Sequence, residues 1–570
     1  MWWIVLATQM VGAGTQDSLG VARAARHAQA RFESYRIDHL PWTDADGRAE
    51  PCDERVGRFC FWYDPSDAWR PAPEAPAIQR ARLELVRALD SLAALLPGDG
   101  WIAGQRVRYL VDAGDTAAAM DAARACRAAA WWCAALAGYA LHEARRYATA
   151  DSAFGAALAA MPAERRCRWT DLSVLLDDLR GTYHRLSCAG RDSLARRIWW
   201  LADPLYLVPG NERRTEHFAR HVLNALQDDA RPPDGVRWEG DSRELLLRYG
   251  WPAGYERERP SPVDIMEGNR SVMAHFAPHS RDFMPPARFV LSPDAIRQDA
   301  WDLDPARPVS SYAPPYATTF HELPHQVAVF RRADAIVVVA SYDVRAPEDS
   351  AAQAERIRQV QAALVLQRSP EARRVMVRGT GATPTGVLLA FAPAESTLVS
   401  LETLDTADST RAARARFWLP VTPHDSGVTL SDPLLFRVER PDSLPSSLPE
   451  AVGAALGSAG VDPGERVGVF WETYGLASHP EPFRVTLTLT RESASFLRRI
   501  AEWTGLARPE DRYVSLSWDE PPVGSLVYPR ALALALPGAT PGRYVLEITL
   551  KMQGQPIAAT TRNIVIESEK

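Results

Sequence analysis

A chain of 570 residues is too long for a single hydrophobic core, because one domain averages about 150 residues, so several domains are expected. The apolar content of 46% and the charged content of 24% are those of an ordinary globular protein. The formal net charge of −6 and the lack of an arginine cluster argue against a nucleic-acid partner, since phosphate recognition needs clustered basic side chains.

The first fifteen residues, MWWIVLATQMVGAGT, are an apolar run that ends in small residues. This pattern is typical of a signal peptide, although no basic residue precedes Arg23. We therefore expect residues 1–20 to be a signal-like segment, and the alternative is a merely hydrophobic N-terminus. The run is shorter than the roughly 20 apolar residues that cross a bilayer, and no later stretch qualifies, so no transmembrane segment is predicted.

The six cysteines include no CxxC pair and no matching histidine spacing, so a zinc site is not expected among them. Their even number fits disulfides in an oxidising compartment, and the alternative is that they are small buried apolar residues. In the N-terminal region, residues 21–77, we predict a disulfide between Cys52 and Cys60, with an unbridged core strand as the alternative. With the signal-like segment, this pattern predicts a periplasmic or extracellular location.

Residues 78–197 have a helical apolar period, beginning with a stripe from Ile78 to Leu95. The stretch from Trp131 to Pro162 matches the 34-residue tetratricopeptide pattern at the positions where helices approach closely or stop, which are Gly138, Ala150, Phe154 and Pro162. The prediction is a set of tetratricopeptide-like repeats whose concave face suits peptide binding, and a plain helical bundle is the alternative.

Two further repeats are expected beside this unit. A weaker one covers Val107 to Arg127, and another should begin near Arg165, because Cys133 and Cys167 stand 34 residues apart. About three repeats would form a small curved stack.

Residues 198–310 join the helical half of the chain to a β-rich half. Asn211 is expected to cap a helix, and Glu212 suits the positive end of the helix dipole. Residues 244–249 read as a short strand between two turns. One apolar stripe should give the helix a buried side and an exposed side, and it consists of Phe218, Val222 and Leu226.

Asp203-Pro204, Asn211-Glu212, Trp238 and Arg248-Tyr249-Gly250 follow one another in this region. This order of signals resembles the GWxTD domain of bacterial proteins. The chain differs from the family at Arg237 and Gly240, where the signature has Gly and Thr, so it is identified as a divergent member. The resemblance implies an exported protein with tetratricopeptide-like helices before the domain, β-sandwiches after it and no established activity. The letters that match the family are Asp203, Pro204, Asn211, Glu212, Glu216, Arg220, Trp238, Asp241, Arg248, Tyr249, Gly250 and Pro252.

Beyond a proline-rich connector over residues 260–316, the apolar period falls to two. Seven strands are expected within residues 311–440 and six within residues 466–570, so each segment is predicted to be an antiparallel β-sandwich. Between them, residues 441–465 form a linker with a short central helix, and residues 493–505 are predicted to insert another helix.

Two histidine pairs have metal-binding spacing. His321 and His325 fit HExxH, in which two histidines on one helix face bind zinc. Pro324 would break that helix, so we expect a loop that leads into a strand. His217 and His221 are also four residues apart but have no third ligand nearby, and we expect a polar helix face packed on the Trp238 turn.

The remaining candidate motif or partner site consists of Asn211, Glu212, Trp238, Asp241, Arg248 and Tyr249. Asp241 could pair with Arg248 while Trp238 shields the pair from water. The structural interpretation is a pinned turn that defines the domain, and the functional one is a partner site.

We therefore predict a non-catalytic, exported scaffold that binds protein partners through helical repeats and β-sandwiches, with no catalytic residue, metal or cofactor. The alternatives are a metal-dependent hydrolase that uses His321 and His325, and an envelope carbohydrate-binding protein, which is suggested by 18 tryptophans.

Overall fold

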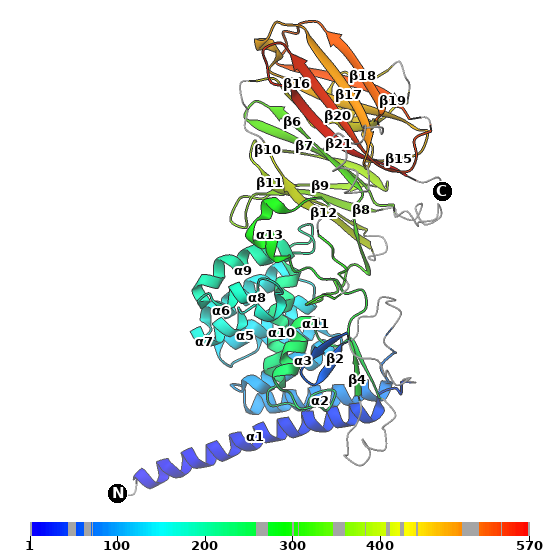
Figure 1. The fold of residues 1–570 in the computed structure, drawn as a ribbon. Coiled ribbons are helices and arrows are strands. Elements are labelled where there is room, and N and C mark those ends of the chain that lie inside the picture. Colours follow the sequence, from blue (N-terminus) through cyan, green and yellow to red (C-terminus); the bar gives the residue numbers. More distant parts are fainter. Residues whose placement is uncertain are drawn as a thin grey trace. The chain divides into compact units, whose positions relative to one another are not determined.

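The chain divides into two compact units, Met1–Ser292 with Asp299–Thr318 and Pro293–Gln298 with Thr319–Lys570. The first, here called the helical unit, is mainly helical, and the second, the sheet unit, consists mainly of β-strands (Figure 1), so the predicted mixed α plus β class is confirmed. The computed structural model describes residues 3–43, 53–61, 70, 72–257, 272–298, 301–305, 307–345, 359–381, 383–405, 411–421, 427–439, 443–492, 512–536 and 538–567.

None of the helices in the described ranges combines the length and the apolar character needed to cross a bilayer, in agreement with the sequence prediction. Two hairpins accompany the helices, β1 (Glu54–Val56) with β2 (Phe59–Phe61) and β3 (Gly254–Arg257) with β4 (Val272–His275). Within the described residues, the helices of the helical unit are α1 (Trp3–His39), α2 (Pro76–Leu95), α3 (Gly100–Asp112), α4 (Thr116–Arg124), α5 (Ala130–Glu143), α6 (Tyr147–Ala160), α7 (Ala163–Trp169), α8 (Arg180–His184), α9 (Cys188–Ala202), α10 (Glu212–Gln227), α11 (Gly240–Tyr249) and α13 (Ala287–Leu291).

Helices α3 with α4, and α5 with α6, form two successive packed pairs. Asp99 begins α3 by accepting hydrogen bonds from the N–H groups of the next helical turn, and Gly114, with a φ of 76°, makes the turn to α4. In the second pair, a Cβ atom on Gly138 would lie 2.8 Å from the ring of Phe154. Since Ala150 and Phe154 are fully buried, the packing roles predicted for these residues are confirmed.

The further helix pair expected from Arg165 does not form. Helix α7 has seven residues and ends at Trp169, after which the side chain of Asp171 accepts the Ser173 N–H and starts a 3-10 turn. Helix α8 has five residues. The 34-residue spacing of Cys133 and Cys167 therefore does not mark a repeat of the helix pair. The two residues belong to different disulfides.

Helix α10 is buried on nearly every side, so the prediction that one side of it is exposed is wrong. Its predicted apolar stripe lies inside the core, but Arg213, His217 and Gln227 are also fully buried. The reason is its position, because α3, α5, α6, α9 and α11 all contact it.

The prediction of a short strand over residues 244–249 is also wrong, because these residues form the second half of α11. A capping box between Glu239 and Ser242 begins the helix, and Gly250, with a φ of 89°, ends it. Three consecutive leucines suggested a strand, but the buried residues Ser242, Leu246 and Tyr249 follow helical spacing.

In the described part of the sheet unit, the strands form four sheets, in the orders β10-β7-β6, β5-β12-β11-β8-β9, β13-β16-β14 with β19 also on β16, and β15-β21-β20-β17-β18. Neighbouring strands are antiparallel except for β5 with β12 and β15 with β21. The strands are β5 (Thr319–Glu322), β6 (His325–Arg332), β7 (Ala335–Asp343), β8 (Val360–Gln367), β9 (Val375–Gly381), β10 (Thr385–Pro393), β11 (Thr397–Asp405), β12 (Arg411–Leu419), β13 (Thr429–Leu430), β14 (Leu434–Arg437), β15 (Gly460–Val461), β16 (Arg466–Tyr474), β17 (Phe483–Arg491), β18 (Arg512–Glu520), β19 (Val527–Ala535), β20 (Gly542–Met552) and β21 (Ala558–Ile566).

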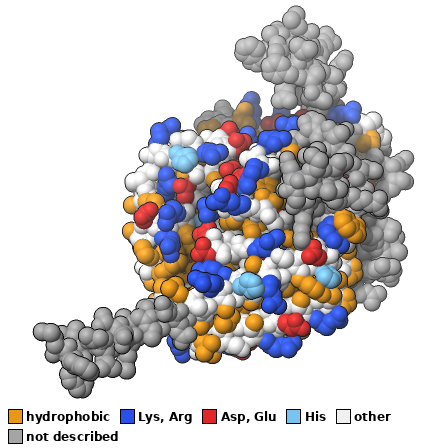
Figure 2. All heavy atoms as spheres, turned by 90° about the horizontal axis from the view of Figure 1, so that it is seen from below, with side chains coloured by type: hydrophobic (Ala, Val, Ile, Leu, Met, Phe, Trp, Pro, Cys, Tyr) orange, Lys and Arg blue, Asp and Glu red, His pale blue; other side chains and the backbone are white. Residues whose placement is uncertain are grey.

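The seven and six strands predicted from alternating patterns correspond to β6–β12 and β16–β21, and are confirmed. The predicted linker contains the expected short helix, α15 (Leu448–Gly453), which packs into a core shared by β6, β7, β14 and β16. The helix predicted over residues 493–505 lies outside the described residues. On the face drawn in Figure 2, basic and acidic side chains are interspersed with hydrophobic ones, so that this face presents no broad area of one charge.

Candidate ligand-binding groove

Asn211 and Glu212 tie the start of α10 to neighbouring segments. The Asn211 side chain accepts the Arg214 N–H at 2.8 Å, as predicted for a cap, and donates to the Trp199 carbonyl at 2.6 Å. The hydroxyl of Tyr316 donates to the buried Glu212 carboxylate. Both residues therefore have a structural role.

The proposed pair between Asp241 and Arg248 is wrong. Asp241 instead binds Arg58, with 2.7 Å between Oδ2 and Nε, and Arg248 binds Glu54 at 3.0 Å. The two residues lie on one helix, seven positions apart, and each reaches the β1–β2 hairpin.

Tyr249 and Trp238 complete the surroundings of α11. The ring of Tyr249 stacks on Phe61 of β2 with centroids 3.9 Å apart, and Trp238 lies 6.4 Å from the ring of Trp251. The motif residues of α11 therefore anchor the β1–β2 hairpin.

Arg220 joins α10 to the end of α11. It donates to the carbonyls of Leu247, Arg248 and Ser311 at 2.9, 3.0 and 2.9 Å, and its Nε lies 2.6 Å from the Glu216 carboxylate. Glu216, Arg220 and the Arg248 carbonyl thus meet in one hydrogen-bonded joint inside the helical unit.

The HExxH-like segment forms two strands with a turn between them. Strand β5 ends at Glu322 and β6 begins at His325, so a loop leads into a strand as predicted and the two imidazoles do not share a helix face. Within the described ranges, no group of three or more His, Cys, Asp or Glu side chains is arranged to hold a metal ion.

His217 and His221 face tryptophans rather than the Trp238 turn. The Nε2 atom of His217 lies 3.0 Å from the Trp169 carbonyl, and the ring of His221 stacks on the Trp169 indole at 5.3 Å. Burial lowers the pKa of His221 to about 3 and also lowers the pKa of His217. Both imidazoles are therefore neutral at pH 7.

Beside His221, the helical unit has a groove of about 790 Å³, within the size range of ligand pockets. Trp101 and Trp131 are partly exposed there, and Trp132 and Trp169 lie almost completely buried beside them. The rim carries charged side chains, namely Arg165, Arg168, Asp228, Asp229 and Arg243.

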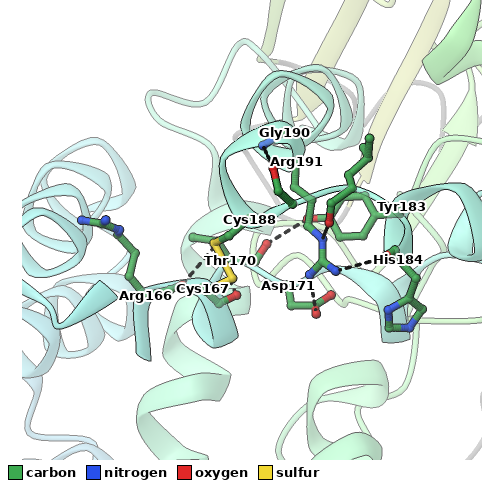
Figure 3. Close-up of a disulfide and its surroundings, with 11 residues drawn as sticks. Arg166, Cys167, Thr170, Asp171, Tyr183, His184, Cys188, Gly190 and Arg191 are labelled. Carbon is green, nitrogen blue, oxygen red and sulfur yellow. Dashed lines mark hydrogen bonds and ion pairs between the residues drawn. A yellow bond between two sulfur atoms is a disulfide. The ribbon is translucent and has the colours of Figure 1, made fainter. Parts of the chain in front are cut away.

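Two disulfides hold the walls of this groove. Cys126–Cys133 closes the loop that carries Ala128 and Ala129 of the lining. Cys167–Cys188 fixes the end of α7 two residues before Trp169 (Figure 3).

Hydrogen bonds support the second disulfide. Figure 3 shows Arg191 beside it, donating to Asp171 at 2.7 Å and to the His184 carbonyl at 3.3 Å, and Tyr183 donates to the Thr170 carbonyl at 2.9 Å. These contacts make the end of α7 a rigid support for Trp169.

The predicted disulfide between Cys52 and Cys60 stays a prediction. Cys60 is disulfide-bonded, and Cys52 lies outside the described residues.

Polar groups of the lining are only partly satisfied. Trp101 Nε1, His221 Nε2 and Asn224 Oδ1 are buried and have no hydrogen-bond partner within the described part of the chain. Leaving such a group unpaired costs about 1–3 kcal/mol, which makes these three residues unusual in a folded core.

Sequence reasoning missed this groove because its residues come from separate helices. One signal was present, since Trp101 and Trp131 are each the second residue of their helix, in α3 and in α5. Equivalent positions in successive helix pairs carry the same aromatic side chain.

No family model matches the sequence, and no curated protein matches it. Among solved structures, red sea bream transglutaminase is similar at 12% identity and a TM-score of 0.13, covering 43% of this chain and 32% of that one. Dimeric latent PorU from Porphyromonas gingivalis is similar at 11% identity and a TM-score of 0.19, covering 53% of this chain and 23% of that one. Escherichia coli alpha-2-macroglobulin activated by porcine elastase is similar at 9% identity and a TM-score of 0.14, covering 42% of this chain and 22% of that one. This chain thus spans less than a third of each, and likenesses of this size carry no functional argument.

Proposed function

We propose that this chain is a non-catalytic, exported interaction protein that binds an extended segment of a protein partner in the tryptophan-lined groove of the helical unit. The observation that carries the proposal is the groove itself, with partly exposed Trp101 and Trp131 above buried Trp132 and Trp169. Tryptophan is enriched where proteins bind one another, because its large ring loses little conformational entropy on binding.

The architecture supports this proposal. We interpret the α3–α4 and α5–α6 pairs as tetratricopeptide-like units, on the basis of the contact between Gly138 and Phe154. We interpret the four sheets as two β-sandwiches that offer further surfaces for protein partners, and the joint around Arg220 as a divergent GWxTD-like domain.

Export is supported by the disulfides. Cys126–Cys133 and Cys167–Cys188 require an oxidising compartment to form and persist, which fits a periplasmic or extracellular location. The separation of His321 and His325 onto two strands gives the metal-dependent hydrolase no support.

A display experiment tests the proposal. The full-length oxidised chain is immobilised and a library of random 12-residue peptides is selected on it. Selected peptides should bind the wild type and lose at least tenfold in affinity on Ala129→Arg, because Ala129 is exposed and lines the groove. Affinity should be unchanged on Trp42→Ala, which alters an exposed tryptophan outside the groove.

The proposal fails if no peptide is selected, or if selected peptides bind the Ala129→Arg variant as tightly as the wild type. A carbohydrate-binding role is the second candidate, favoured by the four indoles, and a glycan array probed with the same three proteins would identify it.

A further inference from the structure

We propose that the segment bound in this groove is proline-rich, in the extended polyproline II conformation. This inference rests on the proposed function and adds the chemistry of the ligand.

The walls of the groove are fixed before a ligand arrives. The indole Nε1 of Trp132 donates to the Gly100 carbonyl at 2.7 Å. The ring of Trp169 makes an edge-to-face contact with Trp131, with centroids 6.1 Å apart, and stacks on the ring of His221. The two disulfides restrict the loops on either side. Rigid aromatic walls suit proline rings, because a polyproline II segment is itself pre-ordered and both partners lose little entropy.

The lining offers two unpaired donors in the part of the chain that the structure describes. Trp101 Nε1 can only donate, and the guanidinium of Arg165 lies 4.6 Å over the Trp131 ring with no acidic partner among the described residues. Proline lacks an N–H, and polyproline II makes no internal hydrogen bonds, so its carbonyls are free to accept. These two donors therefore match the carbonyl groups of an acceptor-rich chain.

The rim carries little unbalanced acidic charge. Asp228 is paired with Arg243 at 2.7 Å, and Asp229 with Arg26 at 3.4 Å. An unpaired acceptor of the lining is the amide oxygen of Asn224, which suits the N–H of a non-proline residue. Together with neutral His221, this favours an uncharged segment over a basic one.

The test uses the full-length oxidised chain and an array of fluorescein-labelled 12-residue peptides with prolines in PxxP spacing, each paired with a counterpart in which every proline is alanine. Fluorescence polarisation measures the dissociation constants. We expect some proline peptides to bind at least tenfold more tightly than their alanine counterparts, and this preference to be lost in Trp131→Ala and in Ala129→Arg but kept in Trp42→Ala.

Equal affinity for proline and alanine peptides, with both weakened by Ala129→Arg, would overturn the proline preference and leave the groove as a general peptide site. Binding to none of the proline peptides overturns this inference, whereas the proposed function is judged separately by the random library. A requirement for acidic residues in bound peptides would also overturn it and would assign recognition to Arg165. Trp131→Phe should retain most of the preference, since it keeps an aromatic wall.

Discussion

Gly250 lies against the guanidinium of Arg220, so closely that a Cβ atom on Gly250 would be 2.9 Å from Nη2. Gly250 also has a φ of 89°, which side chains other than glycine rarely adopt. Gly250→Ala should therefore lower the free energy of unfolding of the helical unit by about 1–3 kcal/mol, measured by urea denaturation. Gly240→Ala is the control, because nothing lies within 4 Å of its Cβ position, and an equal effect of both changes would contradict the explanation.

The contact between α5 and α6 predicts a second pair of glycine variants. Gly138→Ala should destabilise the chain by about 1–3 kcal/mol, because the new methyl group would meet the buried ring of Phe154 at 2.8 Å. Gly155→Ala, in α6, should be neutral or stabilising by up to about 1 kcal/mol, since its Cβ position is open. Thermal unfolding of the two variants beside the wild type distinguishes them. If Gly138→Ala were as stable as the wild type, α5 and α6 would have to move apart without cost, which would contradict the prediction.

The pair of Asp241 with Arg58 predicts a pH dependence. The hydrogen bond from Arg58 holds the pKa of the Asp241 carboxyl well below its usual range. A folded-state pKa below the unfolded value of about 3.9 stabilises the fold above that pH, and this contribution is lost as the pH falls through the folded pKa. Asp241→Asn should therefore reduce stability at pH 7 and converge on the wild type in strong acid. Asp178→Asn, an exposed aspartate, serves as the control, and parallel curves at every pH would refute the pairing.

The Cys126–Cys133 disulfide predicts coupling between stability and ligand binding. Replacing both cysteines by serine should lower the free energy of unfolding by about 2–3 kcal/mol, as expected for a short closed loop. It should also weaken peptide binding, because the loop carries Ala128 and Ala129 of the groove. Chemical denaturation and peptide titration of the double variant measure the two effects. Loss of stability without loss of affinity would mean that the disulfide does not shape the groove.

Much of the sheet unit was accessible from the sequence, because alternating burial is a local property. In β20 the pattern alternates along the strand, and its partners β17 and β21 show the same period. The strands that were missed, such as β13 and β15, have two residues each and leave no periodic pattern. For α11 the three leucines suggested a strand, whereas the deciding signal was the capping box at Glu239.

The site was less accessible, because partners distant in sequence decide it. The sequence points to Asp241 and Arg248, but their partners Arg58 and Glu54 lie more than 180 residues away in the chain. The groove unites the starts of α3 and α5 with the end of α7 and with α10, and helical periodicity within one segment carries no information about such a meeting. The buried polar face of α10 was missed for the same reason, because a helix contacted from several directions lacks a solvent side.

The matching places of Trp101 and Trp131, each one residue into its helix, have an evolutionary implication. Tandem duplication of one helix pair would copy an indole together with its backbone setting, and so would add a recognition step at a regular interval. A binding surface of this type would lengthen by whole helix pairs. The length of the peptide segment that it binds would increase in the same steps.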